Sequence, residues 1–382
     1  MSTTPDAVLA ELSKIQDPDL GRDIVALGFI TRNEVEGGRV RVTINLTTPA
    51  CPVKDQMKAR AEELIAALPG VETVEVEMTA EVRGGREPRN IAPDVKHIVA
   101  VSSGKGGVGK STSTINLAVA LARTGARVGV LDCDAYGPDV PLMMGLKGQP
   151  EATADKKFVP LERHGIKTMS IGYLLPDDKP LMWRGPMVHK MIEQFLADVE
   201  WGELDYLLVD MPPGTGDAQL SLAQIVPLSG GVLVTTPQAV STFDVTKAIG
   251  MFQQVNVEIL GIVENMAGYT VEGRVEGAGA GTQVTIRTGV GNLSTETDAE
   301  GRFRTVVDVF GKGGAEALAA RYNFPVLGQV PLNPAVRVGG DSGDPVVISD
   351  PESPEAEAFV AIAGRLAQRL AIREHAALPI LQ

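Results

Sequence analysis

The chain has 382 residues, of which 44% are hydrophobic and 22% are charged. That length is sufficient for a sizeable apolar core and for two domains. The formal net charge of −13 disfavours diffuse electrostatic attraction to nucleic acid or anionic lipid, and no apolar run approaches the ~20 residues of a membrane span.

The cysteine content and the amino terminus indicate a cellular compartment. The chain contains two cysteines, Cys51 and Cys133, which are too few for the disulfide framework of a small secreted protein. No signal peptide precedes the first predicted helix. We therefore expect a cytoplasmic protein whose partners include neither nucleic acid nor membranes.

Residues 1–82 show the pattern of a small α+β domain. Helical spacing predicts helices over residues 6–15 and 53–68, and alternation predicts strands over residues 28–46, around a Gly-Gly turn, and 71–79. The next segment, residues 83–95, is charged, rich in Gly and Pro and without periodicity. That composition predicts a linker.

From residue 96 to residue 375, apolar strands alternate with helices, and we predict one α/β domain. The predicted strands are residues 97–101, 126–134, 204–212, 230–237, 257–265 and 324–332. The predicted helices are residues 110–124, 187–199, 217–226, 240–255, 313–322 and 354–372. Nearly continuous apolar strands separated by helices indicate a mostly parallel sheet that helices cover on both faces. Ligands of such sheets bind outside the carboxyl ends of the strands.

Residues 101–112, VSSGKGGVGKST, carry the most specific motif of the chain. An apolar run leads into Gly104, four further residues and then Gly109-Lys110-Ser111, which is the pattern of the phosphate-binding loop of P-loop NTPases. Glycines leave the backbone N–H groups free to point at phosphate oxygens, and the following helix offers its positive N-terminal end. The predicted nucleotide-binding residues of this loop are Gly104, Lys105, Gly106, Gly107, Val108, Gly109, Lys110, Ser111 and Thr112. The competing interpretation is a glycine-rich turn without a ligand.

Within this loop, the catalytic and metal-binding roles fall on its last residues. Lys110 would reach the β- and γ-phosphates, and Ser111 would hold Mg²⁺. The ligands expected from these residues are therefore ATP and Mg²⁺.

Carboxylates follow two of the predicted strands. We expect Asp132 to take a Mg²⁺-bound water and Asp134 to orient the attacking water. The alternative for Asp132 is a cap on the turn from strand to loop. Asp210 ends the strand LDYLLVD and fits a carboxylate that supports Mg²⁺ through water, and in the following MPPGTGD segment Gly214 is free to approach the γ-phosphate.

The GKGGVGKS form of the loop resembles the deviant Walker A motif of the MinD/ParA/nitrogenase-iron-protein class of ATPases. The resemblance implies that the additional lysine, Lys105, reaches across a homodimer to the partner's nucleotide and assists catalysis. The alternative is a solvated lysine on a loop. It also implies that the Asp132–Asp134 stretch is switch I, that residues 211–217 are switch II, and that Asn265 recognises the adenine edge, whereas a turn-forming Asn is the competing interpretation.

Residues 183–187, 194–217 and 330–347 together resemble the Mrp/ApbC-type iron–sulfur cluster carrier ATPases. Residues 17–30 and 46–57 resemble the MIP18-type (DUF59) domain that is often fused in front of them. The resemblance implies an ATP-hydrolysing cluster carrier that acts as a nucleotide-switched homodimer. Iron–sulfur scaffold or apo-acceptor proteins would be its partners.

One segment departs from this family pattern. Family members usually carry a Cys-x-x-Cys pair shortly after the strand that ends at Asn265, and two protomers together hold a bridging cluster there. Here residues 271–310 contain no cysteine and predict a β-rich insertion, a small meander with turns at GAGAG, GVGN and DAEG. An iron–sulfur cluster needs about four thiolate ligands, so an iron–sulfur cluster is possible only with other ligands.

The sequence predicts different roles for the two cysteines. Cys133 lies between the two aspartates Asp132 and Asp134, where we expect a role in packing or in switch geometry rather than ligation. Cys51 follows a proline-containing turn at the start of a predicted helix, whose dipole would lower the thiol pKa. Cys51 is therefore the candidate for cluster handling or thiol chemistry, and a plain buried thiol is the alternative.

Three functions remain open on the sequence. The first is a cluster-assembly ATPase that works with Cys51 or with a partner's thiols. The second is an ATP-driven adaptor or chaperone without a cluster of its own. The third is a MinD/ParA-type positioning ATPase. Against it stand the acidic charge, the N-terminal domain and a C-terminal helix, residues 356–372, that is not strongly basic.

Overall fold

The computed structural model describes residues 3–18, 21–51, 53–80, 91–174, 185–214, 217–289 and 291–377. Residues 83–90 of the predicted linker, Trp183 and Arg184, and Thr215 and Gly216 of the predicted switch II lie outside the described residues. Within the described part of the chain, no helix combines the length and the apolar character that a bilayer span requires.

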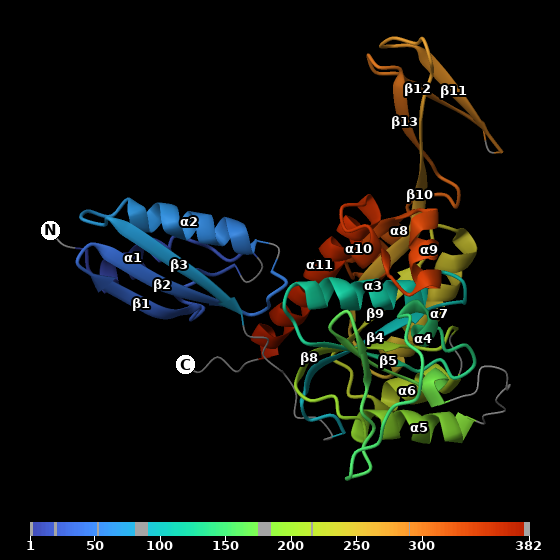
Figure 1. Ribbon diagram of the computed structural model, residues 1–382, viewed down its shortest axis with the longest axis horizontal. Helices are drawn as coiled ribbons and strands as arrows, with labels where there is room; N and C mark the ends of the chain where they lie inside the picture. Colours follow the sequence, from blue (N-terminus) through green and yellow to red (C-terminus); the bar gives the residue numbers. More distant parts are fainter. Residues whose placement is uncertain are drawn as a thin grey trace.

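The N-terminal unit contains two helices and one small sheet (Figure 1). Its elements are α1 (Pro5–Leu12), β1 (Ile30–Glu36), β2 (Arg39–Leu46), α2 (Lys54–Ala66) and β3 (Thr73–Ala80). β1 and β2 are antiparallel around Gly37 and Gly38, both at positive φ, whereas β2 and β3 are parallel because α2 returns the chain between them. The unit has an apolar cluster of its own, which includes Leu12, Ile44 and Ile65.

A nine-stranded sheet forms the centre of the second unit, in the order β13-β10-β9-β4-β8-β5-β7-β6, and β14 also pairs with β10. The first six strands of this sheet in chain order are β4 (Val95–Ser103), β5 (Val128–Asp132), β6 (Leu161–Arg163), β7 (Ile166–Ser170), β8 (Leu204–Asp210) and β9 (Gly230–Thr235). The remaining strands are β10 (Ile259–Arg274), β13 (Arg302–Val307) and β14 (Val326–Leu332). Only β6 and β13 pair antiparallel with their neighbours in this sheet, so the prediction of a mostly parallel sheet is confirmed.

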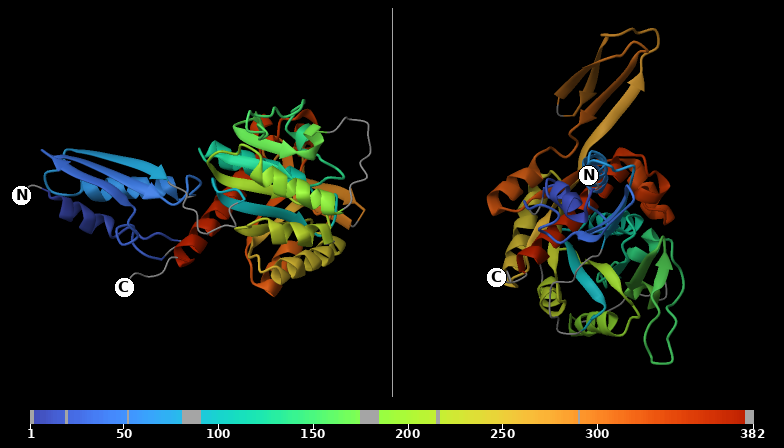
Figure 2. Two further views of the ribbon diagram at one scale, coloured as in Figure 1. Left: turned by 90° about the horizontal axis from the view of Figure 1, so that it is seen from below. Right: turned by 90° about the vertical axis from the view of Figure 1, so that its left-hand side faces the viewer.

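Helices cover both faces of this sheet (Figure 2). The six predicted helices are present as α3 (Lys110–Arg123), α5 (Gly185–Ala197), α6 (Asp217–Ile225), α7 (Ala239–Gln254), α8 (Gly314–Tyr322) and α11 (Pro354–Ala377). One apolar layer contains residues of α3 and α11, and the other contains residues of α5, α6, α7 and α8. The short helices α4 (Val140–Met143), α9 (Pro334–Ser342) and α10 (Val346–Ser349) were not predicted.

Residues 269–307, which we name the arm, project away from the central sheet (Figure 1). The arm contains the second part of β10, then β11 (Gln283–Thr288), β12 (Gly291–Glu296) and β13. The predicted meander pairing is wrong, because β10 pairs with β13 and β11 pairs with β12. The reason is that the first turn does not fold the chain back along β10. Instead, Val275, directly after β10, donates its N–H to the carbonyl of Gly301, directly before β13.

Candidate nucleotide-binding site

The phosphate-binding loop lies at the carboxyl end of β4, where the chain turns into α3. Gly107 and Gly109 adopt φ values of +79° and +82°, a region that favours glycine. A Cβ on Gly104 would lie 2.3 Å from the backbone carbonyl carbon of Asp244 in α7. A Cβ on Gly109 would lie 2.1 Å from Nδ2 of Asn265. The glycines are therefore required both by the backbone conformation and by close neighbours.

This loop lines a cavity of about 380 Å³. The cavity is bounded by most of the predicted site residues, namely Lys105, Gly106, Gly107, Gly109, Lys110, Ser111, Thr112, Asp134 and Asn265. Four predicted residues, Gly104, Val108, Asp132 and Asp210, lie behind this lining. The opposite wall was not predicted, and it comes from Asp139, Met143, Asn333, Val336, Arg337 and Asp341.

Three side chains of α3 converge on the carboxylate at the end of β8. Lys110 Nζ lies 2.6 Å from Asp210 Oδ2, and Ser111 donates its hydroxyl to the same oxygen at 2.6 Å. Thr114 donates to Asp210 Oδ1 at 2.7 Å. Because Asp210 is 1% exposed, its charge depends on this ion pair and on these hydrogen bonds.

The donor set fits Mg²⁺ bound together with a nucleotide. Mg²⁺ usually takes one or two protein oxygens and completes its shell with water and phosphate oxygens. Ser111 and Asp210 supply one hydroxyl and one carboxylate beside the phosphate loop. Among the described residues, no group of three or more His, Cys, Asp or Glu side chains could hold a metal ion, so these residues suit a nucleotide-bridging ion rather than a cage of protein ligands.

Asp132 is fully buried and has the hydrogen bonds of a loop cap. Its carboxylate accepts from Ser170 Oγ at 2.8 Å and from the backbone N–H of Asp134 at 3.0 Å. Burial, together with the negative charge of Asp210, raises the pKa of Asp132 to about 8. This geometry favours the capping interpretation, and the role of Asp132 toward a Mg²⁺-bound water stays a prediction.

Two further carboxylates of the segment after β5, Asp134 and Asp139, border the cavity. Asp134 Oδ1 accepts from the backbone N–H groups of Tyr136 and Gly137, each at 3.2 Å, so it shapes the loop that it begins. Asp139 was not predicted, although it is the third carboxylate of DCDAYGPDV. Burial and the charges of Asp134 and Asp210 raise the pKa of Asp139.

The two residues assigned by resemblance both lie at the cavity. Lys105 is half-buried, and its Nζ lies 3.5 Å from Gln238 Oε1 at the start of α7. Asn265 is buried and donates Nδ2 to the carbonyl of Val108 at 2.9 Å, so it braces the loop from below. The adenine contact of Asn265 stays a prediction.

The unpredicted wall is built on α9. Asn333 Oδ1 accepts from Ala335 N–H at 2.8 Å and caps this helix, whose first residue is Pro334. The Asn-Pro pair after the predicted strand 324–332 was the available signal. Two adjacent glycines, Gly339 and Gly340, lie inside this nine-residue helix, and glycine disfavours a helix prediction.

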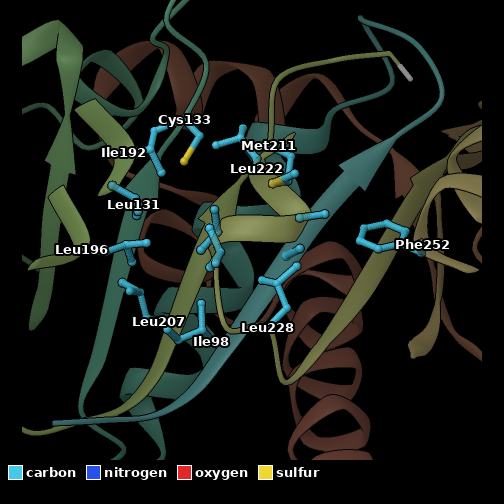
Figure 3. Packing of buried hydrophobic residues seen from close by; sticks show 14 of the residues in the cluster. Ile98, Leu131, Cys133, Ile192, Leu196, Leu207, Met211, Leu222, Leu228 and Phe252 are labelled. Carbon is cyan, nitrogen blue, oxygen red and sulfur yellow. The ribbon is translucent and has the colours of Figure 1, made fainter. Parts of the chain in front are cut away.

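Cys133 and Cys51 occupy contrasting surroundings. Cys133 is 0% exposed and packs in the apolar cluster that contains Leu131, Ile192 and Met211 (Figure 3). Burial, followed by the charges of Asp132 and Asp210, raises the pKa of the Cys133 thiol well above its usual range. The expected packing role of Cys133 is therefore confirmed.

Cys51 is partly exposed and is not disulfide-bonded. It lies three residues before Lys54, where α2 begins. It borders a small pocket between the N-terminal unit and α11, which Thr48, Gln368 and Ile372 also line. The thiol is therefore at the boundary of the two units rather than in a core.

The parallel sheet, the glycine-rich loop between β4 and α3 and the Lys110–Asp210 pair define a P-loop NTPase. A family model described as NUBPL iron-transfer P-loop NTPase (ParA) matches residues 94–278 and 280–367. The chain belongs to this family. A second model, described as iron–sulfur cluster assembly protein, matches residues 5–78.

Relatives with assigned names extend over nearly the whole chain. An "iron-sulfur cluster carrier protein" of Deinococcus radiodurans is 45% identical over 98% of this chain and 98% of its own length. A protein of the same name from Synechocystis sp. is 45% identical over 97% of this chain and 98% of its own length. Among solved structures, a nucleotide-binding protein of Archaeoglobus fulgidus in complex with ADP is 36% identical, with a TM-score of 0.53, over 70% of this chain and 93% of that chain.

Proposed function

We propose that this protein is a Mg²⁺-dependent ATPase that acts as a nucleotide-switched homodimer in the carriage or assembly of iron–sulfur clusters. The observation that carries the proposal is the convergence of Lys110 and Ser111 on Asp210 beside the phosphate loop. Membership of the iron-transfer P-loop NTPase family and the names of the relatives support the assignment of the cargo.

Each side chain of the site has a task in this proposal. Lys110 leaves Asp210 and binds the β- and γ-phosphates. Ser111 and Asp210 hold Mg²⁺, which neutralises charge on the phosphate oxygens when it is bound. Asp134 orients the attacking water. Lys105 acts on the nucleotide of the second protomer.

Exposed apolar side chains beside the cavity support association of two copies. Tyr136, two residues after Asp134, is 70% exposed. Val240 and Phe243 of α7 are 64% and 65% exposed, and they follow Gln238, which contacts Lys105. Exposed apolar groups gathered near one site are typical of protein–protein contact surfaces.

The cluster is the cargo, and the chain offers few ligands for it. Cys133 is buried and its pKa is raised, so it is unsuited to provide a thiolate. A dimer therefore presents two accessible thiols, both from Cys51, while a cluster needs about four ligands. We propose that acceptor or scaffold proteins supply the remaining ligands during transfer.

A second function, an ATP-driven adaptor without a cluster, is favoured by one observation. The segment where family members usually carry the cysteine pair forms the arm, which contains no cysteine. In this alternative the protein uses the same nucleotide switch, and the arm contacts a client protein.

Anaerobic reconstitution with iron and sulfide separates the two functions. For a carrier, we expect a visible charge-transfer band and transfer to an apo-ferredoxin, with Cys51→Ser losing transfer and keeping ATP hydrolysis. Lys110→Ala should lose nucleotide binding, while Lys58→Ala, an exposed lysine of α2, serves as the matched control. Absence of both band and transfer in the wild type overturns the carrier function, and normal hydrolysis by Lys110→Ala overturns the nucleotide site.

A further inference from the structure

A loop of the N-terminal unit, residues 47–51, is held between two walls of the ATPase unit; we name it the docking loop. Its first contact is with β8: Thr48 Oγ1 lies 3.1 Å from the hydroxyl of Tyr206, and these residues are 3% and 1% exposed. Its second contact is with α11: Ala50 is buried in the same apolar cluster as Phe359 and Ile362. Cys51 is the next residue of the loop.

The second wall is shaped for close approach of the docking loop. A Cβ on Gly364, in the middle of α11, would lie 3.3 Å from the carbonyl oxygen of Ala50. Glycine inside a helix is less stable than alanine, so its presence here is explained by the backbone that packs against it. The docking loop is therefore seated in a fitted groove rather than on an open surface.

A third contact joins the two walls at the same place. The ring of His97 in β4 stacks on Tyr206 with centroids 5.6 Å apart. His97 Nε2 lies 3.3 Å from Glu374 Oε1 of α11. Strands β4 and β8 and helix α11 thus meet where the docking loop enters (Figure 2 shows α11 reaching toward the N-terminal unit).

The two walls are also connected through α3, which begins at the nucleotide site. β8 spans Leu204–Asp210, so the strand that carries Tyr206 ends at Asp210. Asp210 is bonded to Lys110, Ser111 and Thr114 of α3. Helix α3 in turn packs against α11 in one apolar cluster. A shift of α3 relative to β8 is therefore also a shift of α11 relative to Tyr206.

We infer that nucleotide binding loosens the docking loop and uncovers Cys51. Mg²⁺–ATP takes Lys110 to the phosphates and Ser111 to the metal, which removes two of the three direct bonds between α3 and Asp210. The two walls then move relative to each other, and the loop, which is hydrogen-bonded to β8 and packed against α11, loses its fit. The inference rests on the proposed nucleotide site but not on the cluster cargo.

The test measures alkylation of Cys51 by N-ethylmaleimide in the full chain, with and without saturating Mg²⁺–ATP, by mass spectrometry of the Cys51 peptide. We expect alkylation about fivefold faster or more with nucleotide, the scale of typical allosteric coupling. Buried Cys133 is the internal reference and should stay slow. Nucleotide binding is measured in parallel with a fluorescent ATP analogue.

The outcomes separate the inference from the proposed function. Nucleotide bound with an unchanged Cys51 rate overturns the coupling alone. No nucleotide bound overturns the nucleotide site and the coupling with it. Neither the alkylation measurement nor the nucleotide-binding measurement requires a reconstituted cluster.

Substitutions in the docking contact provide the second arm of the test. Tyr206→Phe and Thr48→Val each remove the shared hydrogen bond, and we expect both to speed Cys51 alkylation without nucleotide. By reciprocity they should also tighten Mg²⁺–ATP binding by a few-fold. Thr48→Ser keeps the hydroxyl and should restore wild-type behaviour.

The matched control is Tyr173→Phe. Tyr173 is a buried tyrosine whose hydroxyl lies 2.7 Å from Thr168 Oγ1 of β7, and β7 is separated from β8 by β5. This variant should leave both the Cys51 rate and its nucleotide dependence unchanged. Faster alkylation in Tyr206→Phe with unaltered Mg²⁺–ATP affinity would show a purely structural contact and would overturn the coupling.

Discussion

Two glycines of the phosphate loop share a left-handed conformation but differ in what surrounds them. A Cβ on Gly107 would meet nothing within 4 Å, whereas a Cβ on Gly109 would lie 2.1 Å from Asn265 Nδ2. Both substitutions impose the backbone strain of a positive φ, about 1–2 kcal/mol for an L-residue. Only the second also displaces the side chain that braces the loop.

We therefore predict that Gly109→Ala lowers the free energy of unfolding more than Gly107→Ala does. Urea denaturation measures the difference, and the added loss should be at least about 1 kcal/mol because a buried hydrogen bond to Val108 is disturbed. Asn265→Ala in the Gly109→Ala background should recover part of it. Equal losses in the two single variants would mean that Asn265 moves aside without cost.

For single residues, the sequence predicts which ligand a side chain can bind better than it predicts which other residues that side chain contacts. Lys110, Ser111 and Asp210 could be assigned because the motif and the strand ends dictate what each can bind. The bond between Asp132 and Ser170 could not be foreseen, since it joins segments 38 residues apart. Nor could the Asn265–Val108 bond, because it depends on how closely β10 passes beneath the loop.

At the scale of elements, two short helices form the unpredicted wall of the nucleotide cavity, and one arginine holds both. Arg163, at the end of β6, donates Nη1 to the carbonyl of Met144, just after α4, at 2.9 Å. Its Nη2 donates to Asp344 Oδ1, just after α9, at 2.8 Å. Arg163 thus fixes the ends of α4 and α9 relative to each other.

We predict that Arg163→Ala weakens nucleotide binding without abolishing it. The side chains of the ion pair are 32% and 43% exposed, so solvent screening reduces its contribution to about 1 kcal/mol, a change of about fivefold in affinity. Equilibrium binding of a fluorescent ATP analogue measures the change. Arg32→Ala, which removes an exposed ion pair of the N-terminal unit, is the control, and equal effects of the two would contradict the role of Arg163.

Length and burial decide which elements could be predicted. Six helices and six of the parallel strands of the central sheet were predicted, but β7 (Ile166–Ser170), a buried parallel strand of five residues, was missed. β6 has three residues and α4 has four, too few for a periodic signal. The pairing within the arm was missed because alternation identifies a strand but not its neighbour.

At the scale of the whole molecule, substitution of Lys105 tests whether two copies of the chain together form each nucleotide site. Its Nζ contacts Gln238 within its own chain, beside the exposed Val240 and Phe243. The Lys105→Ala variant should keep most nucleotide binding and lose ATP-dependent dimerisation and hydrolysis, because the trans contact would be missing.

Light scattering with and without Mg²⁺–ATP, together with phosphate release, measures this prediction. Lys147→Ala removes an exposed lysine and should leave both readouts unchanged. Dimerisation and turnover by Lys105→Ala at the wild-type level would exclude a trans role for this lysine.

Strand β10 has two parts that should differ in their protection from amide hydrogen exchange, one in the central sheet and one in the arm. Residues 260–265 of β10 are buried between β9 and β14, whereas among the described residues of the arm only Thr297 and Gly301 are buried. Amide hydrogens exchange through local opening where few apolar contacts resist it. We predict that amides of the arm exchange with deuterium orders of magnitude faster than those of residues 260–265, which mass spectrometry of overlapping peptides would resolve.

Protection that is uniform along β10 would contradict this boundary. With the boundary confirmed, the arm can unfold and refold locally while the sheet beneath the nucleotide stays folded. A single continuous strand then belongs both to a rigid sheet that carries the nucleotide site and to an extension that unfolds by itself.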